Sequence, residues 1–120
     1  MVTTVQTTTA TENGMDLLAE RFVFRDAPVI ANFVRQYPDV VAPLLEAVAV
    51  IPRFFGRDVG LVLEVERDRE ALDQVQLCAL IQTGLDADTA LASLDQFDQE
   101  WWLDVLPRAA PHLMFALEYV

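Results

Sequence analysis

The C-terminal part of the chain places an amphipathic helix between two alternating apolar segments, and this order limits the topology more than any other feature. The segments Val75–Thr83 and Leu113–Tyr119 carry apolar side chains at every second position, which is typical of strands with one buried face. Between them, apolar residues recur at steps of three and four from Ala87 to Val105, which predicts a helix with one buried side. A strand, a helix and a parallel strand in this order form a crossover that is right-handed in nearly all proteins, so the helix should cover one face of a sheet.

The helix of this unit has a start signal and a stop signal. Asp86 can accept hydrogen bonds from the free amides of a first turn, so the helix should begin near Ala87. Pro107 lacks a backbone donor and clashes with the preceding turn, so the helix should end there.

The double tryptophan of this helix predicts one buried and one exposed indole. Adjacent residues on a helix point about 100° apart, so Trp101 should continue the buried stripe and Trp102 should lie at its exposed edge. Asp95, Asp98 and Asp104 lie off the stripe. We interpret Trp102 with these carboxylates as a candidate surface for a basic protein partner. A bound cation or a merely solvated helix face would explain the same carboxylates, and the solvated face is the simpler interpretation.

The N-terminal half predicts two helices. Asp26 can cap a helix whose second position is Pro28. A second helix should begin near Asp39 or Ala42, and Pro52 should kink or end it. This helix is apolar on nearly all sides. Such a helix is buried between layers or inside a dimer contact.

A further alternating run, from Leu61 to Glu66, predicts a strand that pairs antiparallel with Val75–Thr83. We therefore expect one α+β domain over residues 15–120. In this domain two N-terminal helices precede a ββαβ unit, and the three-stranded mixed sheet has its first strand in the centre and packs on the helices. The Thr-rich residues 1–14 should form a flexible arm or an edge strand.

Composition excludes several classes of function. The chain has 120 residues, of which 53% are hydrophobic, enough for one core without a metal or a disulfide. Its net charge of -11 repels nucleic acid and anionic membranes, so neither is expected as a partner. Lysine is absent, which excludes Schiff-base chemistry and a P-loop lysine. The single cysteine, the lack of a signal peptide and the lack of a long apolar run predict a cytoplasmic protein.

Few side chains could support catalysis or bind a cofactor. Ser93, Cys78 and His112 are the only residues of their types, so we expect no catalytic residues and no cofactor. Four residues on one side of the expected sheet could bind a divalent metal, although a solvated polar face is the preferred explanation: Glu64, Glu66, His112 and Glu118.

The same sheet face has an apolar centre that predicts self-association. Its residues are Val62, Cys78, Leu80, Met114 and Ala116, with Glu and Gln around them. Such a centre is costly to leave in water, so we expect a homodimer with Leu80 and Met114 near the middle of its interface.

From about Tyr37 to its end, the sequence resembles a family of small, acidic, functionally uncharacterised bacterial proteins. The resemblance rests on Leu61-Val62-Leu63-Glu64-Val65, Asp68, Glu70, Ala90-Leu91, Leu94-Asp95, Phe97-Asp98, Glu100-Trp101-Trp102-Leu103-Asp104 and Leu117-Glu118-Tyr119-Val120. The resemblance implies a small cytosolic protein and brings no activity, cofactor or catalytic residue with it.

These observations together predict a non-catalytic protein-protein interaction module, with an antitoxin-like partner of a basic protein as one form of it. A self-assembling homodimeric domain is the first alternative. A metal-binding or enzymatic protein that uses the carboxylates of the sheet face is the second.

Overall fold

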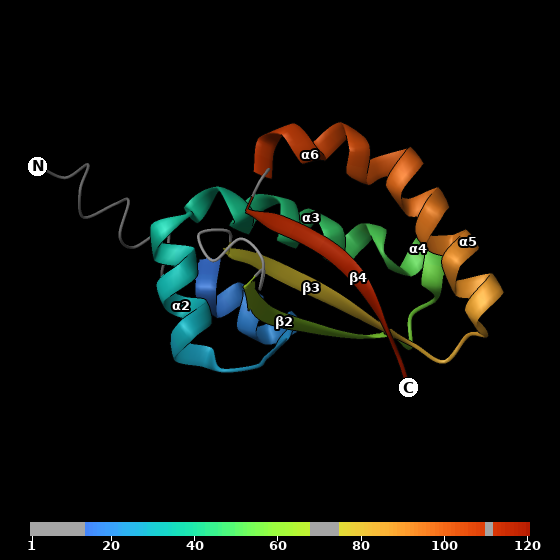
Figure 1. Ribbon diagram of the computed structural model, residues 1–120, viewed down its shortest axis with the longest axis horizontal. Helices are drawn as coiled ribbons and strands as arrows, with labels where there is room; N and C mark the ends of the chain where they lie inside the picture. The colour runs from blue at the N-terminus through green and yellow to red at the C-terminus, as the bar shows by residue number, and fades with distance from the viewer. Residues whose placement is uncertain (1–13, 68–74, 110–111) are drawn as a thin grey trace, which may run out of the picture.

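The computed structural model describes residues 14–67, 75–109 and 112–120, and within them a mixed sheet of four strands in the order β1-β2-β3-β4 (Figure 1). The strands are β1 (Val23–Phe24), β2 (Gly60–Arg67), β3 (Val75–Thr83) and β4 (Leu113–Tyr119). β2 pairs antiparallel with β3, while β1 with β2 and β3 with β4 are parallel. The expected N-terminal arm lies almost wholly outside the described residues.

The helices pack on one face of this sheet (Figure 1). A helix over residues 14–21 comes first, followed by α2 (Ala27–Gln36), the 3-10 turn η1 (Pro38–Val40), α3 (Val41–Val50) and α4 (Pro52–Phe55). After β3 come α5 (Ala87–Phe97), the π-helical segment η2 (Asp98–Trp102) and α6 (Leu103–Ala109). In the described part of the chain, no helix has the length and apolar character needed to span a membrane.

The α+β class is confirmed, but the expected three-stranded sheet and its strand order are wrong, because the sheet has four strands. Helices do pack against a mixed sheet, yet β3 and not β2 lies between the long strands. The free edge of β2 is taken by residues 23–24, and Arg25 N donates to Leu63 O at 2.9 Å. β4 therefore pairs with β3, the strand from which the crossover helix leaves. The two expected N-terminal helices also do not match in detail, because a helix over residues 14–21, the turn η1 and the separate helix α4 after Pro52 occur as well.

The alternating pattern correctly assigned the residues of the long strands to two faces. On the helical face, Leu63 of β2 lies opposite Ala79 of β3, which lies opposite Phe115 of β4. Leu63 and Ala79 are buried in the main core, and Phe115 packs against it. α3, which is apolar on nearly all sides, buries Leu44 and Ala47 in the same core.

The crossover helix begins as expected but changes its phase at η2. Asp86 caps it by accepting a hydrogen bond from Thr89 N. In η2, Leu103 N donates to Asp98 O, a bond five residues back, so this turn holds an extra residue. The buried positions after Phe97 are consequently Trp102 and Val105, and Trp101 is only half-buried. The prediction of a buried Trp101 and an exposed Trp102 is therefore wrong.

Two expected helix signals do not act as predicted. Asp26 precedes α2 with a φ of 64° and makes no side-chain capping bond, because its backbone is left-handed there. Pro107 lies inside α6 and does not end it. Pro107 removes a single backbone donor from a short segment that is already anchored by buried Val105 and Ala109.

Candidate functional site

The sheet face turned away from the helices has an apolar centre whose middle residues are buried. Val62, Cys78 and Leu80 are 2%, 0% and 7% exposed, with half-buried Met114 and Ala116 packed against them. The expected dimer surface needed an exposed centre at Leu80 and Met114. Leu80 is instead buried within a single chain and Met114 is half-buried, so this centre exposes less apolar surface than expected, and the homodimer stays a prediction.

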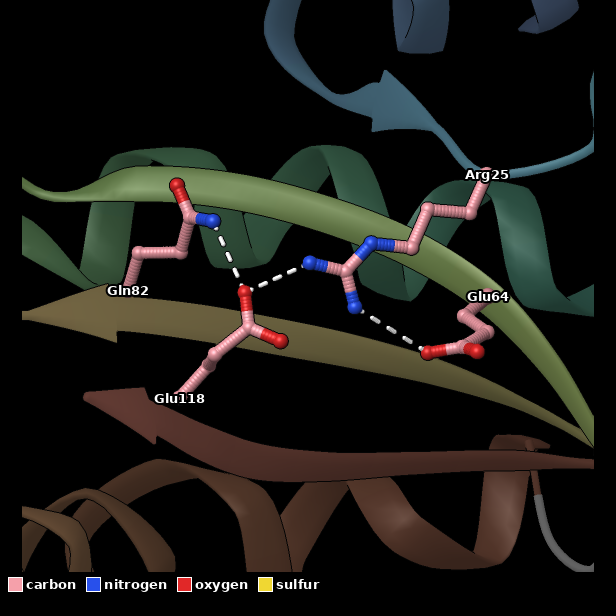
Figure 2. Close-up of polar contacts among 4 residues, drawn as sticks. All are labelled: Arg25, Glu64, Gln82 and Glu118. Carbon is pink, nitrogen blue, oxygen red and sulfur yellow. Dashed lines mark hydrogen bonds and ion pairs between the residues drawn. The ribbon is translucent and has the colours of Figure 1, made fainter. Parts of the chain in front are cut away.

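Arg25 extends over this face from the end of β1 and binds side chains of β2 and β4 (Figure 2). Its Nη1 lies 3.3 Å from Glu64 Oε2, and its Nη2 donates to Glu118 Oε1 at 2.6 Å. Gln82 Nε2 donates to the same Glu118 oxygen at 2.8 Å. We call Arg25, Glu64, Gln82 and Glu118 the Arg25 network. It lies on the face that bears the apolar centre.

The Arg25 network determines the local electrostatics of this face. Hydrogen bonds from Arg25 and then from Gln82 lower the pKa of Glu118 below its ordinary value. Burial, with a smaller contribution from nearby carboxylates such as Glu66, raises the pKa of the Cys78 thiol to about 12. Cys78 therefore remains a protonated thiol near neutral pH and is a packing residue rather than a nucleophile.

His112 lies apart from the Arg25 network, beside the helices. Its Nδ1 is 3.4 Å from Asp39 Oδ2, and its ring stacks on Tyr37 with centroids 3.8 Å apart. Among the described residues, no hydrogen bond joins His112 to Ser93 or Cys78. Within the described residues, the Asp39–His112 pair therefore has neither the serine nor the cysteine of the chain bonded to it.

The four residues of the candidate metal set are not brought together. Glu64 and Glu118 both bind Arg25, while His112 binds Asp39. Across residues 14–67, 75–109 and 112–120, no three His, Cys, Asp or Glu side chains form a group that could hold a metal ion.

The acidic surface of α5, η2 and α6 carries the expected carboxylates but not the expected tryptophan. Asp95 and Asp104 are exposed and Asp98 is half-buried, whereas Trp102 is 8% exposed and unavailable to a partner. The ion pairs within the described residues involve Arg25, Arg108 and His112, and none of them includes these three aspartates. Partial burial and the charge of Asp95 raise the pKa of Asp98, so its carboxylate would gain from a cationic neighbour.

Sequence reasoning did not single out the outer edge of β4. β4 has seven residues, and in the sheet formed by the described residues it is the last strand and pairs on one side only, with β3. Leu77 N donates to His112 O, and Val120 N donates to Thr83 O, so the even-numbered residues of this segment face β3. The backbone groups of Leu113, Phe115, Leu117 and Tyr119 consequently point outward. No partner for them occurs in the described part of the chain.

An incompletely covered apolar strip runs beside this edge. Phe115 and Leu117 point toward the helical layer, yet both are only half-buried. The half-buried Trp101 lies next to them, with its ring centroid 5.9 Å from that of Phe115. Figure 1 shows α5 and α6 on the side of β4 away from β3, so the helical layer continues past the last strand. We call the outward edge of β4, together with Phe115, Leu117 and Trp101, the β4 margin.

Comparison of this chain with protein-family models, with curated proteins and with solved structures found no match in any of the three.

Proposed function

We propose that the chain is a non-catalytic protein-interaction module that binds another protein by adding an extended segment of it to the outer edge of β4. The observation that supports this proposal is the row of outward backbone groups at Phe115, Leu117 and Tyr119. A strand edge of this kind is a template for pairing with another chain, because each unpaired N–H and C=O gains a partner there.

The β4 edge also lacks the usual features that prevent pairing. Edge strands are commonly protected by lysine, by proline, by a bulge or by an unpaired charge. The sequence Leu113–Tyr119 contains no lysine and no proline, and its register with β3 is unbroken. Its only charged residue, Glu118, is neutralised by Arg25. The other edge of the sheet, β1, offers only two residues.

The chemistry of the remaining polar residues agrees better with binding than with catalysis. Among the described residues, His112 contacts an aspartate and a tyrosine and has no bond to Ser93 or Cys78, and the Cys78 thiol is buried. The acidic α5–α6 surface favours a basic partner. An antitoxin-like protein that holds a basic partner in the cytoplasm is one form of this function.

The proposal is tested by recovering the partner from native cells with variants of Tyr119. This residue is 50% exposed and its N–H points outward, so Tyr119→Pro removes an edge donor and leaves the pairing of β4 with β3 intact. Tyr119→Ala is the matched control, because it removes the same side chain and keeps the N–H. We expect wild type and Tyr119→Ala to retain the same identified protein and Tyr119→Pro to lose most of it. Equal retention by all three forms would contradict binding at the β4 edge.

A further inference from the structure

We propose that the segment that pairs with β4 is an extended, basic stretch of a different protein, with apolar side chains on one face and Arg or Lys beside Asp98. This inference rests on the proposed function and specifies the chemistry of the partner.

The apolar requirement follows from the position of the β4 margin. A strand added outside β4 would alternate its side chains between the helical layer and the open face. On the helical side it would meet Phe115, Leu117 and Trp101, which the chain itself leaves half-buried. Apolar side chains at every second position of the added strand would remove this surface from water. The continuation of α5 and α6 past β4 provides the surface on which those side chains would lie (Figure 1).

The basic requirement follows from the carboxylates on the same helices that have no cationic partner among the described residues. Asp98 lies one turn before Trp101 and Trp102, which both contact Phe115 of β4. Its half-buried carboxylate has no cationic partner among the described residues, and its only resolved electrostatic neighbour, Asp95, is also acidic. A guanidinium or ammonium group from the added strand would relieve this repulsion.

A second copy of this chain fits the same edge less well. Two copies would each bring a net charge of -11 to the interface. Antiparallel pairing of β4 with its own copy would also direct both helical layers to the same side of the joined sheet. Because α5 and α6 already continue past β4, the two sets of helices would compete for one space (Figure 1). A basic strand from another protein has neither problem.

The inference is tested with three synthetic peptides of equal length. The first alternates Val and Lys, and the second alternates Val and Glu. The third is the first peptide with its central residue replaced by Pro. The affinity of each peptide for the full chain is measured by titration calorimetry. Changes in the NMR chemical shifts of the backbone amides of the chain then locate the binding site. We expect the Val-Lys peptide to bind with the largest shifts at Phe115, Leu117 and Tyr119, and the other two to bind at least tenfold more weakly.

A pair of charge variants separates a specific contact from bulk attraction. Asp98→Asn and Asp88→Asn remove the same charge from the same helical unit, but Asp88 lies in the first turn of α5. We expect Asp98→Asn to weaken binding of the Val-Lys peptide about two- to fivefold more than Asp88→Asn does. Equal effects of the two variants, or equal binding of the peptide with Pro, would contradict the inference.

Two further results would reject the inference while leaving the proposed function intact. The first is equal binding of the Val-Glu peptide at the β4 amides, which would mean edge pairing without charge selection. The second is a concentration-dependent dimer in sedimentation that protects the same amides, which would mean that a second copy occupies the edge. Both proposals are rejected if no peptide binds at β4 and if Tyr119→Pro retains the partner from native cells as well as wild type does.

Discussion

At the scale of single residues, Arg25 makes the polar contacts that connect three strands across the sheet face turned away from the helices. It follows the shortest strand, and it bonds to Glu64 of β2 and Glu118 of β4 at once. A buried apolar centre lies on the same face, although no second layer of protein covers it within the described residues. Ion pairs at this level of exposure contribute little stability on their own. What Arg25 does contribute is charge neutralisation, because it pairs with Glu118, the one charged residue of β4.

We predict that Arg25→Gln raises the pKa of Glu118 toward its ordinary value, because the largest cause of its lowered pKa is the hydrogen bond from Arg25. A carboxylate with a lowered pKa stabilises the fold above the ordinary glutamate pKa and loses that contribution as the pH falls through its lowered pKa. In Arg25→Gln, the stability of the fold should therefore no longer include this contribution from Glu118, which wild type loses as the pH falls. Titration of the Glu118 carboxyl by NMR measures the change, with Arg108→Gln, which breaks the distant pair with Glu46, as the control. An unchanged Glu118 titration in Arg25→Gln would show that the network does not form in solution.

At the scale of elements, the π-helical segment η2 decides how the crossover helix meets the sheet. Its extra residue rotates the rest of the helix, so Trp102 replaces Trp101 in the core and packs on Phe115 with ring centroids 4.8 Å apart. Trp101 remains beside the β4 edge, half-buried, where it forms part of the β4 margin. The same rotation that buries one indole thus leaves the other available to an added strand.

We predict that Trp102→Ala lowers the free energy of unfolding by about 3–5 kcal/mol, the usual cost of emptying a buried aromatic site. Trp101→Ala should cost clearly less, because its side chain is already partly in water. Urea unfolding followed by far-UV circular dichroism compares the two variants without relying on tryptophan fluorescence. An equal or larger loss in Trp101→Ala would mean that the helix keeps regular phase through residues 98–102.

At the scale of the whole molecule, the long strands and the start of the crossover helix were predictable from the sequence. β2, β3 and β4 carry a clear period of two, and Asp86 is a strong capping residue. β1 was not predictable, because two residues carry no period, and its pairing with β2 changed the strand order. η2 was also not predictable, because its residues fit a regular helix as well as a π-helix and the choice depends on packing.

The candidate site was less predictable than the fold. The acidic α5–α6 surface followed from the sequence, but the exposure of Trp102 did not, since it depended on the helix phase. Arg25 and Glu118 are 93 residues apart in the chain, and no local pattern signals their contact. The expected strand order also placed β4 at an edge of the sheet, but with β2 as its neighbour instead of β3, and the period-two pattern does not show which backbone groups of β4 point outward.

Hydrogen exchange of the β4 backbone amides tests the central claim most directly. The inward N–H groups of Met114, Ala116 and Glu118 pair with β3, while those of Phe115, Leu117 and Tyr119 point outward. In the isolated chain, NMR should therefore show slow exchange at Met114, Ala116 and Glu118 and fast exchange at the outward set, and binding of the partner should slow the outward set. Strong protection of the Phe115 and Leu117 amides in the isolated, monomeric chain would mean that the edge is already occupied, and would contradict a protein-binding role for β4.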